Sequence, residues 1–139
     1  HKEYRRQRQM CIRDRVNAFR ELMAGSTRSR EETAQLLASA YIECASNNTD
    51  EFYAVGAALA GSDEKAAVFQ ELLDNCVQMF VSVLAPHCNL PAPELEQRCT
   101  GLVGAGEALA GALVRGKFAK TAAIDAFTAL IRGALQGAV

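Results

Sequence analysis

Tryptophan is absent from this chain, and proline and aromatic residues are scarce. The 139 residues include three prolines, three tyrosines and six phenylalanines, so that aromatic residues make up 6% of the total. Proline disrupts helices and aromatic residues favour strands, so their scarcity in a chain rich in alanine and leucine favours helices. No segment shows the alternation of apolar and polar residues that is typical of a strand. We therefore expect an all-α fold, and the length suits one domain.

Histidine is almost absent, and the chain lacks the spacings that hold a metal or a nucleotide. With two histidines and no CxxC pair, we expect no metal site and no cofactor. The segment Gly104-Ala-Gly106 lacks both the third glycine and the preceding strand of a dinucleotide-binding turn. Acidic pairs such as Glu31/Glu32 and Asp63/Glu64 fall in first helical turns, where they complement the helix dipole. Because no titratable pair faces another on the predicted core faces, we expect no enzyme.

Long apolar runs are also lacking. The longest uncharged run, Asn75–Pro93, contains proline, histidine and asparagine, whereas a membrane span needs about 20 mostly apolar residues. No apolar stretch follows the basic N-terminus as in a signal peptide. The five cysteines are odd in number and widely spaced, which is typical of free thiols in a reducing compartment. We therefore expect a cytoplasmic protein without membrane contact. Cys44, Cys76 and Cys99 would pack into its core or, alternatively, sense oxidants.

Charge is unevenly distributed along the chain. Residues 1–30 hold nine bases and three acids, a net charge of +6, and the remainder holds six bases and thirteen acids, a net charge of −7. A basic arm of this kind can bind nucleic acid. However, the stretch Arg8–Arg15, RQMCIRDR, resembles the translated sequencing adapter found at the ends of assembled reads. We therefore expect residues 1–15 to be non-native and the biological domain to cover residues 16–139.

Apolar residues repeat at helical spacing in six segments, which predicts a bundle of about six antiparallel helices. Capping residues mark several of the starts, as in the capping-box pattern Ser29-Arg-Glu-Glu32 and at Pro93, and glycine or asparagine marks several of the ends. The predicted helices lie within Glu3–Met23, Ser29–Asn47, Thr49–Gly61, Ser62–Pro86, Pro93–Arg115 and Lys120–Leu135.

The fifth segment carries the spacing of two closely packed helices. Its apolar positions are separated by four and three residues in turn, at Leu95, Cys99, Leu102, Gly106, Leu109 and Leu113. Glycine also recurs in this helix, although each glycine costs a helix about 1 kcal/mol relative to alanine. Four glycines in one helix therefore indicate that another backbone or a ligand approaches closely.

Aromatic residues gather on the second to fourth predicted helices, at Tyr41, Phe52, Tyr53, Phe69 and Phe80. They form either core or the lining of a pocket, because ligand pockets in helical bundles are mostly apolar with a few placed polar groups. Glu107 stands alone among small apolar residues. We expect it to be solvated, to pair with a partner subunit or to meet a polar group of a ligand, in that order.

From about Val16 onward the chain resembles the C-terminal domain of tetracycline-repressor-type (TetR-family) transcriptional regulators. The resemblance lies in the order of the segments and in particular stretches. These are Tyr41-Ile-Glu-Cys-Ala-Ser-Asn-Asn-Thr-Asp-Glu-Phe52-Tyr53, the acidic helix start at Ser62, Leu102-Val-Gly-Ala-Gly-Glu-Ala-Leu109, Arg115-Gly-Lys and Ala122-Ala-Ile-Asp-Ala-Phe-Thr-Ala-Leu-Ile-Arg-Gly-Ala-Leu135. The likeness is one of pattern, since this half of the family carries no invariant motif.

The resemblance implies an effector-binding and dimerisation domain. Its last two helices would form a four-helix interface with those of a second copy, and we expect the interface residues to be Leu102, Gly106, Leu109, Leu113, Ile124, Phe127, Ile131 and Leu135. The second, fourth and fifth helices would enclose a pocket for a small apolar effector, lined by Tyr41, Cys44, Phe52, Phe69, Leu73, Cys76, Phe80, Cys99 and Val103.

The resemblance also implies operator DNA as a partner of the whole regulator. The family contacts operator DNA through an N-terminal helix-turn-helix head, and residues 1–28 cannot hold the three helices of that head. We therefore expect operator binding only through a head that is missing here. The alternative hypothesis is a stand-alone helical module that forms homodimers or binds small molecules without regulating DNA.

Overall fold

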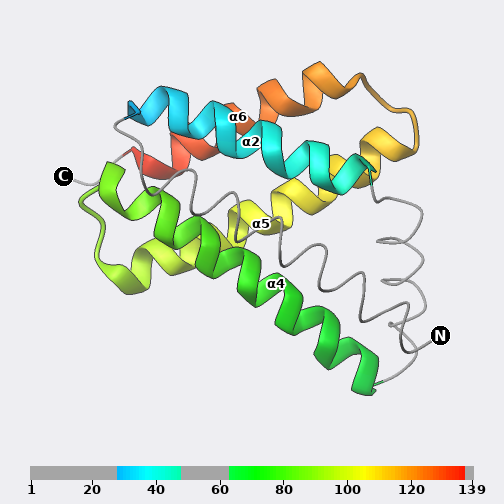
Figure 1. Ribbon diagram of the computed structural model, residues 1–139, viewed down its shortest axis with the longest axis horizontal. Helices are drawn as coiled ribbons and strands as arrows, with labels where there is room; N and C mark the ends of the chain where they lie inside the picture. Colours follow the sequence, from blue (N-terminus) through cyan, green and yellow to red (C-terminus); the bar gives the residue numbers. More distant parts are fainter. Residues whose placement is uncertain (1–27, 48–62, 137–139) are drawn as a thin grey trace.

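The computed structural model describes residues 28–47 and 63–136, and every regular element in these ranges is helical (Figure 1). The predicted all-α class is therefore confirmed for this part of the chain. The elements are α2 (Arg30–Asn47), α4 (Asp63–Leu84), the short 3-10 helix η1 (Ala85–His87), α5 (Ala92–Val114) and α6 (Lys120–Leu135). The helices predicted within Glu3–Met23 and Thr49–Gly61, and the segment 1–15, lie outside the described residues.

The start of α2 follows from its sequence. The Ser29 hydroxyl accepts a hydrogen bond from the backbone N–H of Glu32 at 3.2 Å, as the capping pattern predicts. The same turn is joined to the end of α4. Arg30 donates from Nε to the carbonyl oxygen of His87 at 3.2 Å, and the Thr33 hydroxyl lies 3.2 Å from His87 Nε2. The N-terminus of α2 is thus held against the turn between α4 and α5.

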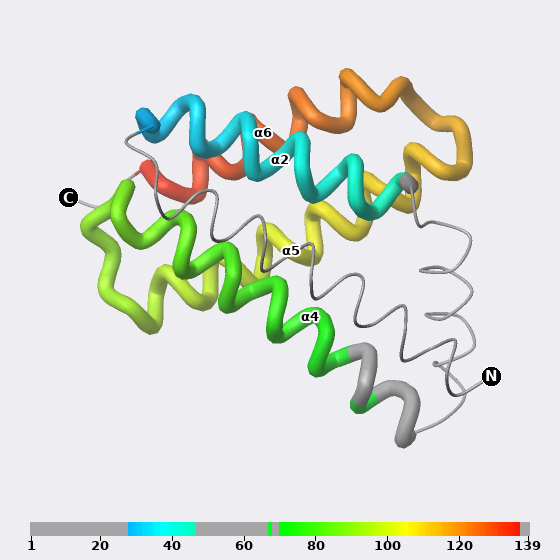
Figure 2. Tube along the Cα trace, in the orientation of Figure 1, coloured from blue at the N-terminus to red at the C-terminus, as the bar shows by residue number. Residues whose placement is uncertain are grey.

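Two ion pairs show that α2 and α6 run antiparallel (Figures 1 and 2). Glu31, near the start of α2, pairs with Arg132 near the end of α6 at 2.8 Å, and Glu43 pairs with Lys120 at the start of α6 at 3.0 Å. Such exposed pairs contribute roughly 0–1 kcal/mol each to stability. They therefore indicate how the two helices are aligned but stabilise that alignment only slightly. The buried residues between the two helices supply most of the binding energy.

The last two helices form a hairpin. Gly116, with φ +74°, allows the chain to turn after α5, because a left-handed backbone is easily adopted only by glycine. At the other end, the Arg98 guanidinium of α5 donates to the carbonyl oxygens of Ala134 at 2.7 Å and Gln136 at 2.9 Å. These bonds place a positive charge at the negative C-terminus of α6 and hold that end against α5.

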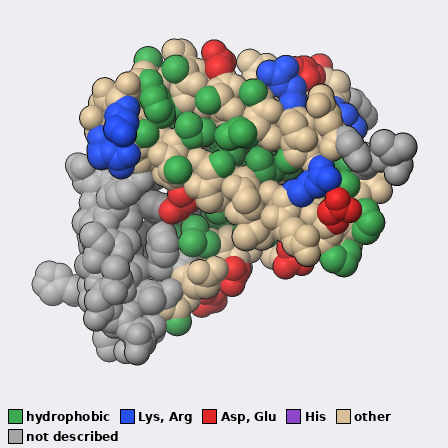
Figure 3. Space-filling view, turned by 180° about the vertical axis from the view of Figure 1, so that it is seen from behind, with side chains coloured by type: hydrophobic (Ala, Val, Ile, Leu, Met, Phe, Trp, Pro, Cys, Tyr) green, Lys and Arg blue, Asp and Glu red, His purple; other side chains and the backbone are tan. Residues whose placement is uncertain are grey.

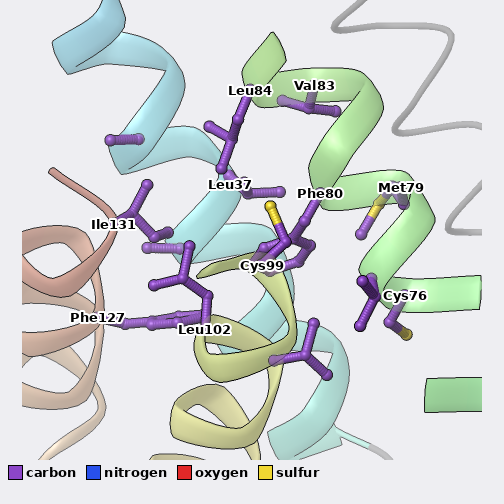
Figure 4. Packing of buried hydrophobic residues seen from close by; sticks show 14 of the residues in the cluster. Leu37, Cys76, Met79, Phe80, Val83, Leu84, Cys99, Leu102, Phe127 and Ile131 are labelled. Atoms are coloured by element: carbon purple, nitrogen blue, oxygen red, sulfur yellow. The ribbon is translucent and has the colours of Figure 1, made fainter. Parts of the chain in front are cut away.

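One core joins all four long helices (Figure 4). Its largest fully buried side chains include Leu37 and Ile42 from α2, Phe80 and Leu84 from α4, and Phe127 and Ile131 from α6. Cys99 and Leu102 of α5 lie among them. The alternating spacing that predicted close packing of α5 therefore packs this helix against the same chain.

Candidate functional site

Tyr41 of α2 lies where the four long helices meet. Its ring centroid is 5.6 Å from that of Phe80 on α4 and 5.6 Å from that of Phe127 on α6, and both pairs meet edge to face. The rings of Phe80 and Phe127 are themselves 6.1 Å apart. Aromatic pairs favour this arrangement, which adds to the burial of the rings. The half-buried Tyr41 thus bridges two fully buried phenylalanines.

On α5, Gly106 makes room for the Tyr41 ring. A Cβ atom at position 106 would lie 2.6 Å from Cε1 of Tyr41 and 2.9 Å from Cζ of Phe127, distances at which atoms clash. Residue 106 must therefore lack a side chain if the two rings are to keep their places. This explains one of the glycines that the sequence places in α5.

Next to Gly106, the carboxyl group of Glu107 is half-buried beside Tyr41. Burial raises the pKa of Glu107 above its ordinary value, because a charged carboxylate is less stable away from water, and a side-chain hydrogen bond with Tyr41 acts in the opposite direction. Glu107 also raises the pKa of the nearby Cys76 thiol. Full solvation, the first of our three expectations for Glu107, therefore does not describe its position.

The structure brings together only part of the predicted pocket. Tyr41 and Leu73 are partly buried and pack against the core, and Cys44 interacts electrostatically with Cys76 across α2 and α4. Phe80, Cys99 and Val103 are at most 2% exposed, so a ligand could reach them only by displacing core side chains. Phe52 and the side chain of Phe69 lie outside the described residues.

The Cys76 and Cys99 thiols do not have the environment of redox sensors. Burial is the largest cause that raises the pKa of Cys76 and of Cys99, in each case to about 12. The reactive form of cysteine is the thiolate, so both thiols are poor nucleophiles near neutral pH. Packing in the core, the first of our two expectations, describes the positions of Cys76 and Cys99, whereas Cys44 is only partly buried.

Most of the residues predicted for the dimer interface face inward. Five of them are covered within one chain: Leu102, Gly106, Phe127, Ile131 and Leu135. The other three, Leu109, Leu113 and Ile124, are partly buried and pack against the same core. A side chain that is already covered has no surface to offer a second copy, so the five buried residues build the core of the monomer. The residues predicted for the dimer interface thus lie on the sides of α5 and α6 that face the core of the same chain.

The outer faces of α5 and α6 are made of small residues. On α6, Ala122, Ala126, Ala129 and Gly133 are exposed, and beyond the first turn of α5 the exposed glycine and alanine residues are Gly101, Gly104 and Ala108. Leu130 of α6 is a large apolar residue on this surface and is 47% exposed. We call these eight residues the outer face. Seen from behind, hydrophobic side chains are spread over the middle of the described surface, with acidic and basic side chains both among and around them (Figure 3).

Within the described part of the chain, three glycines of the outer face have no close neighbour that requires the lack of a side chain. A Cβ atom at Gly101, Gly104 or Gly133 would meet nothing within 4 Å. Each interior glycine nevertheless costs its helix about 1 kcal/mol relative to alanine. In this respect they differ from Gly106, whose missing side chain the Tyr41 and Phe127 rings require. Sequence patterns alone could not separate these two kinds of glycine.

Comparisons of the chain with protein-family models, with curated proteins and with solved structures found no match. Within residues 28–47 and 63–136, no helix has both the length and the apolar character needed to cross a bilayer. In the same ranges, no three His, Cys, Asp or Glu side chains come close enough together to hold a metal ion.

Proposed function

We propose that the chain is the effector-binding and dimerisation domain of a one-component transcriptional regulator of the tetracycline-repressor type. In this proposal α5 and α6 pair with the same helices of a second copy, and the outer face forms the contact. The observation that carries the proposal is the composition of that face: seven small residues and one exposed leucine, with the exposed Glu94 of α5 and Asp125 of α6 at its edges.

Helix packing gives the physical reason. Two helices approach most closely where their facing side chains are small, and glycine allows the closest contact of all. The open glycines of the outer face lower the helix propensity of one chain, and no described neighbour requires them to lack a side chain. Contact with a second copy would provide such a neighbour. A dimer with two-fold symmetry uses the same surface on both copies, so that surface must be complementary to itself. On the outer face, Leu130 of one copy can pack against the small residues of the other.

The effector part of the proposal is supported by the surroundings of Tyr41 and Glu107. α2 and α4 lie close together near η1 and diverge toward their other ends, with α5 crossing behind them (Figure 1). Tyr41 and Leu73 are partly buried against the core, Cys44 of α2 interacts electrostatically with Cys76 of α4, and Glu107 adds one carboxyl group beside Tyr41. A mostly apolar lining with one or two polar groups is what a small apolar effector needs.

Regulation would then follow from differential affinity. An effector changes the behaviour of a dimer only if it binds one arrangement of the two subunits more tightly than the other. In the proposed regulator, the two arrangements differ in the spacing of the DNA-binding heads. The contact of Tyr41 with α4, α5 and α6 would connect the effector region to the dimer helices.

Sedimentation of two matched variants tests the dimer. Leu130→Glu places a charge on the outer face, whereas Leu36→Glu places the same charge on α2, where Leu36 is 37% exposed. We expect the wild-type chain and Leu36→Glu to sediment as dimers of the 15.0 kDa chain. Leu130→Glu should sediment as a monomer with an unchanged circular dichroism spectrum, because the substituted side chain is exposed in one chain and buried in the dimer. A monomeric wild type, or a Leu130→Glu dimer of wild-type affinity, would contradict the proposal.

A further inference from the structure

The outer side of α5 has opposite charges at its two ends. Glu94, Gly101, Ala108 and Arg115 follow one another at intervals of seven residues. Seven residues make about two helical turns, so these four positions lie on one side of α5. The side chain of Glu94 is 47% exposed, and Arg115, the C-cap of the helix, is exposed as well. The small residues of α5 are therefore bounded by an acid where the helix begins and by a base where it ends.

The tip of the α5–α6 hairpin is strongly basic. Half of the six bases in residues 31–139 lie there, at Arg115, Lys117 and Lys120, although residues 31–139 as a whole have a net charge of −7. Lys120 pairs with Glu43 at 3.0 Å. Among the described residues, neither Arg115 nor Lys117 makes an ion pair. Two positive charges at the tip are thus available to a partner.

The midpoint between these end charges has no side chain to keep another helix away. Counted along α5, it falls at Gly104 and Ala105. A Cβ atom at Gly104, or at Gly101 one turn earlier, would meet nothing within 4 Å. Helices approach most closely at glycine. The place where a second helix can come nearest to α5 therefore coincides with the midpoint between its acid and its base.

On α6, an acid and a base are arranged about the same height of the hairpin. Asp125 and Arg132 are seven residues apart, and the acid is again nearer the start of the helix. Gly106 lies at the height of Phe127, because a Cβ atom at 106 would be 2.9 Å from Cζ of that ring. Since α5 and α6 run in opposite directions (Figure 2), the midpoint between Asp125 and Arg132 lies at about the height of Gly104.

We propose that the two copies pair with α5 antiparallel to α5 and α6 antiparallel to α6, so that Glu94 of each copy lies opposite Arg115 of the other. This inference rests on the proposed dimer and adds to it the orientation of the two copies. The two-fold axis crosses α5 at Gly104. Residues equally far from the axis on either side then face each other, and every contact between the copies occurs twice.

The other symmetric way to stack the two hairpins places like charges together. In it, α5 of one copy lies against α6 of the other, and the two-fold axis runs along the helices. Both hairpin tips then lie at the same end of the dimer, with Arg115 and Lys117 of one copy beside the same bases of the other. Like charges across an interface are strongly unfavourable. In the proposed orientation the tips lie at opposite ends, and each meets the end of α5 that holds Glu94.

Glu94 can accept a second cation although it already has one in its own chain. Arg98 donates from Nη2 to Oε1 of Glu94 at 3.0 Å, and its Nη1 is bound to the carbonyl oxygens of Ala134 and Gln136. A carboxylate has two oxygens with about four acceptor positions. Arg115 of the second copy can therefore join this group without displacing Arg98.

The experiment is the dimer dissociation constant of charge-reversed variants, measured by sedimentation equilibrium. In the proposed dimer, Arg115→Glu places an acid opposite Glu94 at both ends, so the constant should rise about tenfold or more. Glu94→Arg should have a similar effect, because it places a base opposite Arg115. Glu96→Arg is the matched control: it makes the same change of charge two residues away, on a different side of α5, and should pair like the wild type.

Mixing the variants tests which residues meet. In a mixed dimer of Glu94→Arg with Arg115→Glu, both contacts again join opposite charges, so the mixture should pair about as tightly as the wild type. The double variant Glu94→Arg/Arg115→Glu should pair with itself for the same reason. It should not pair with the wild-type chain, because both contacts would then join like charges.

The outcomes separate this inference from the proposed function. An Arg115→Glu chain that pairs more tightly than the wild type would contradict the orientation, because relief of repulsion is expected where the two tips lie side by side. Single variants with unchanged constants, or folded single variants whose mixture does not pair, would also overturn it and leave the dimer standing. A wild-type chain that is monomeric at every concentration would overturn the proposed dimer, and the orientation with it.

Discussion

Gly106→Ala is expected to destabilise the fold by about 1–3 kcal/mol, the usual cost of overfilling a packed core. The added Cβ atom would lie 2.6 Å from Cε1 of Tyr41 and 2.9 Å from Cζ of Phe127. Neither ring can move aside easily, since Tyr41 is already packed against Phe80 and Phe127 against Tyr41. Chemical denaturation monitored by circular dichroism, at a dilution where the chain is monomeric, measures the change in unfolding free energy.

Gly104→Ala is the matched control, two residues away on the same helix. Its Cβ atom would meet nothing within 4 Å, so the substitution should stabilise the monomer by about 1 kcal/mol through helix propensity alone. The two glycine-to-alanine substitutions are thus expected to have opposite signs. Equal effects would contradict the close packing of Tyr41 on Gly106.

Phe127→Ala is expected to cost about 3–5 kcal/mol of unfolding free energy, the range for removing a large side chain from a packed core. Phe127 is 0% exposed and contacts both Tyr41 and Phe80. The cost should be the same in dilute and in concentrated protein, because the lost contacts lie within one chain. Thermal or urea denaturation at two protein concentrations measures it.

Leu130→Ala, three residues further along α6, is the comparison. Leu130 is 47% exposed, so its truncation should change the stability of the dilute monomer by about 0.5 kcal/mol or less. In the proposed dimer it should weaken pairing, so its cost should appear only at high protein concentration. The opposite result would be a large loss of monomer stability in Leu130→Ala and a loss of pairing alone in Phe127→Ala. It would support the dimer interface expected from the sequence.

The ends of the described helices could be predicted because local chemistry determines them. Ser29 and Glu32 mark the start of α2 and Pro93 that of α5, while the predicted sixth helix has the bounds of α6, Lys120–Leu135. These features depend on neighbours within a few residues, such as capping groups and the fixed φ of proline. The sequence therefore carries the information for them directly.

The partner of each helix face could not be predicted in the same way. The spacing of Leu95, Cys99 and Leu102 shows that one face of α5 is buried, but a face buried in its own chain and a face buried against a second copy have the same period. The resemblance to a dimeric family favoured the second copy. The structure packs these three residues in the core of the chain, and leaves the opposite, glycine-bearing side exposed.

The pairing of Tyr41 with Glu107 had no local signal either. The two residues are 66 positions apart, and only the packing of α2 on α5 brings them together. An isolated glutamate in a helix of small residues did mark Glu107 as unusual. The same pattern could not name its neighbour, because spacing along one helix holds no information about another helix.

The central claim is that the outer face of α5 and α6 is kept small for a second copy of the chain. The most direct test is the dimer dissociation constant of the double variant Gly101→Ala/Gly104→Ala, compared with the wild type by sedimentation equilibrium. We expect a weaker dimer from a more stable monomer, because each alanine favours the helix and its methyl group occupies space that the partner needs. A double variant that pairs as tightly as the wild type, or more tightly, would contradict the claim.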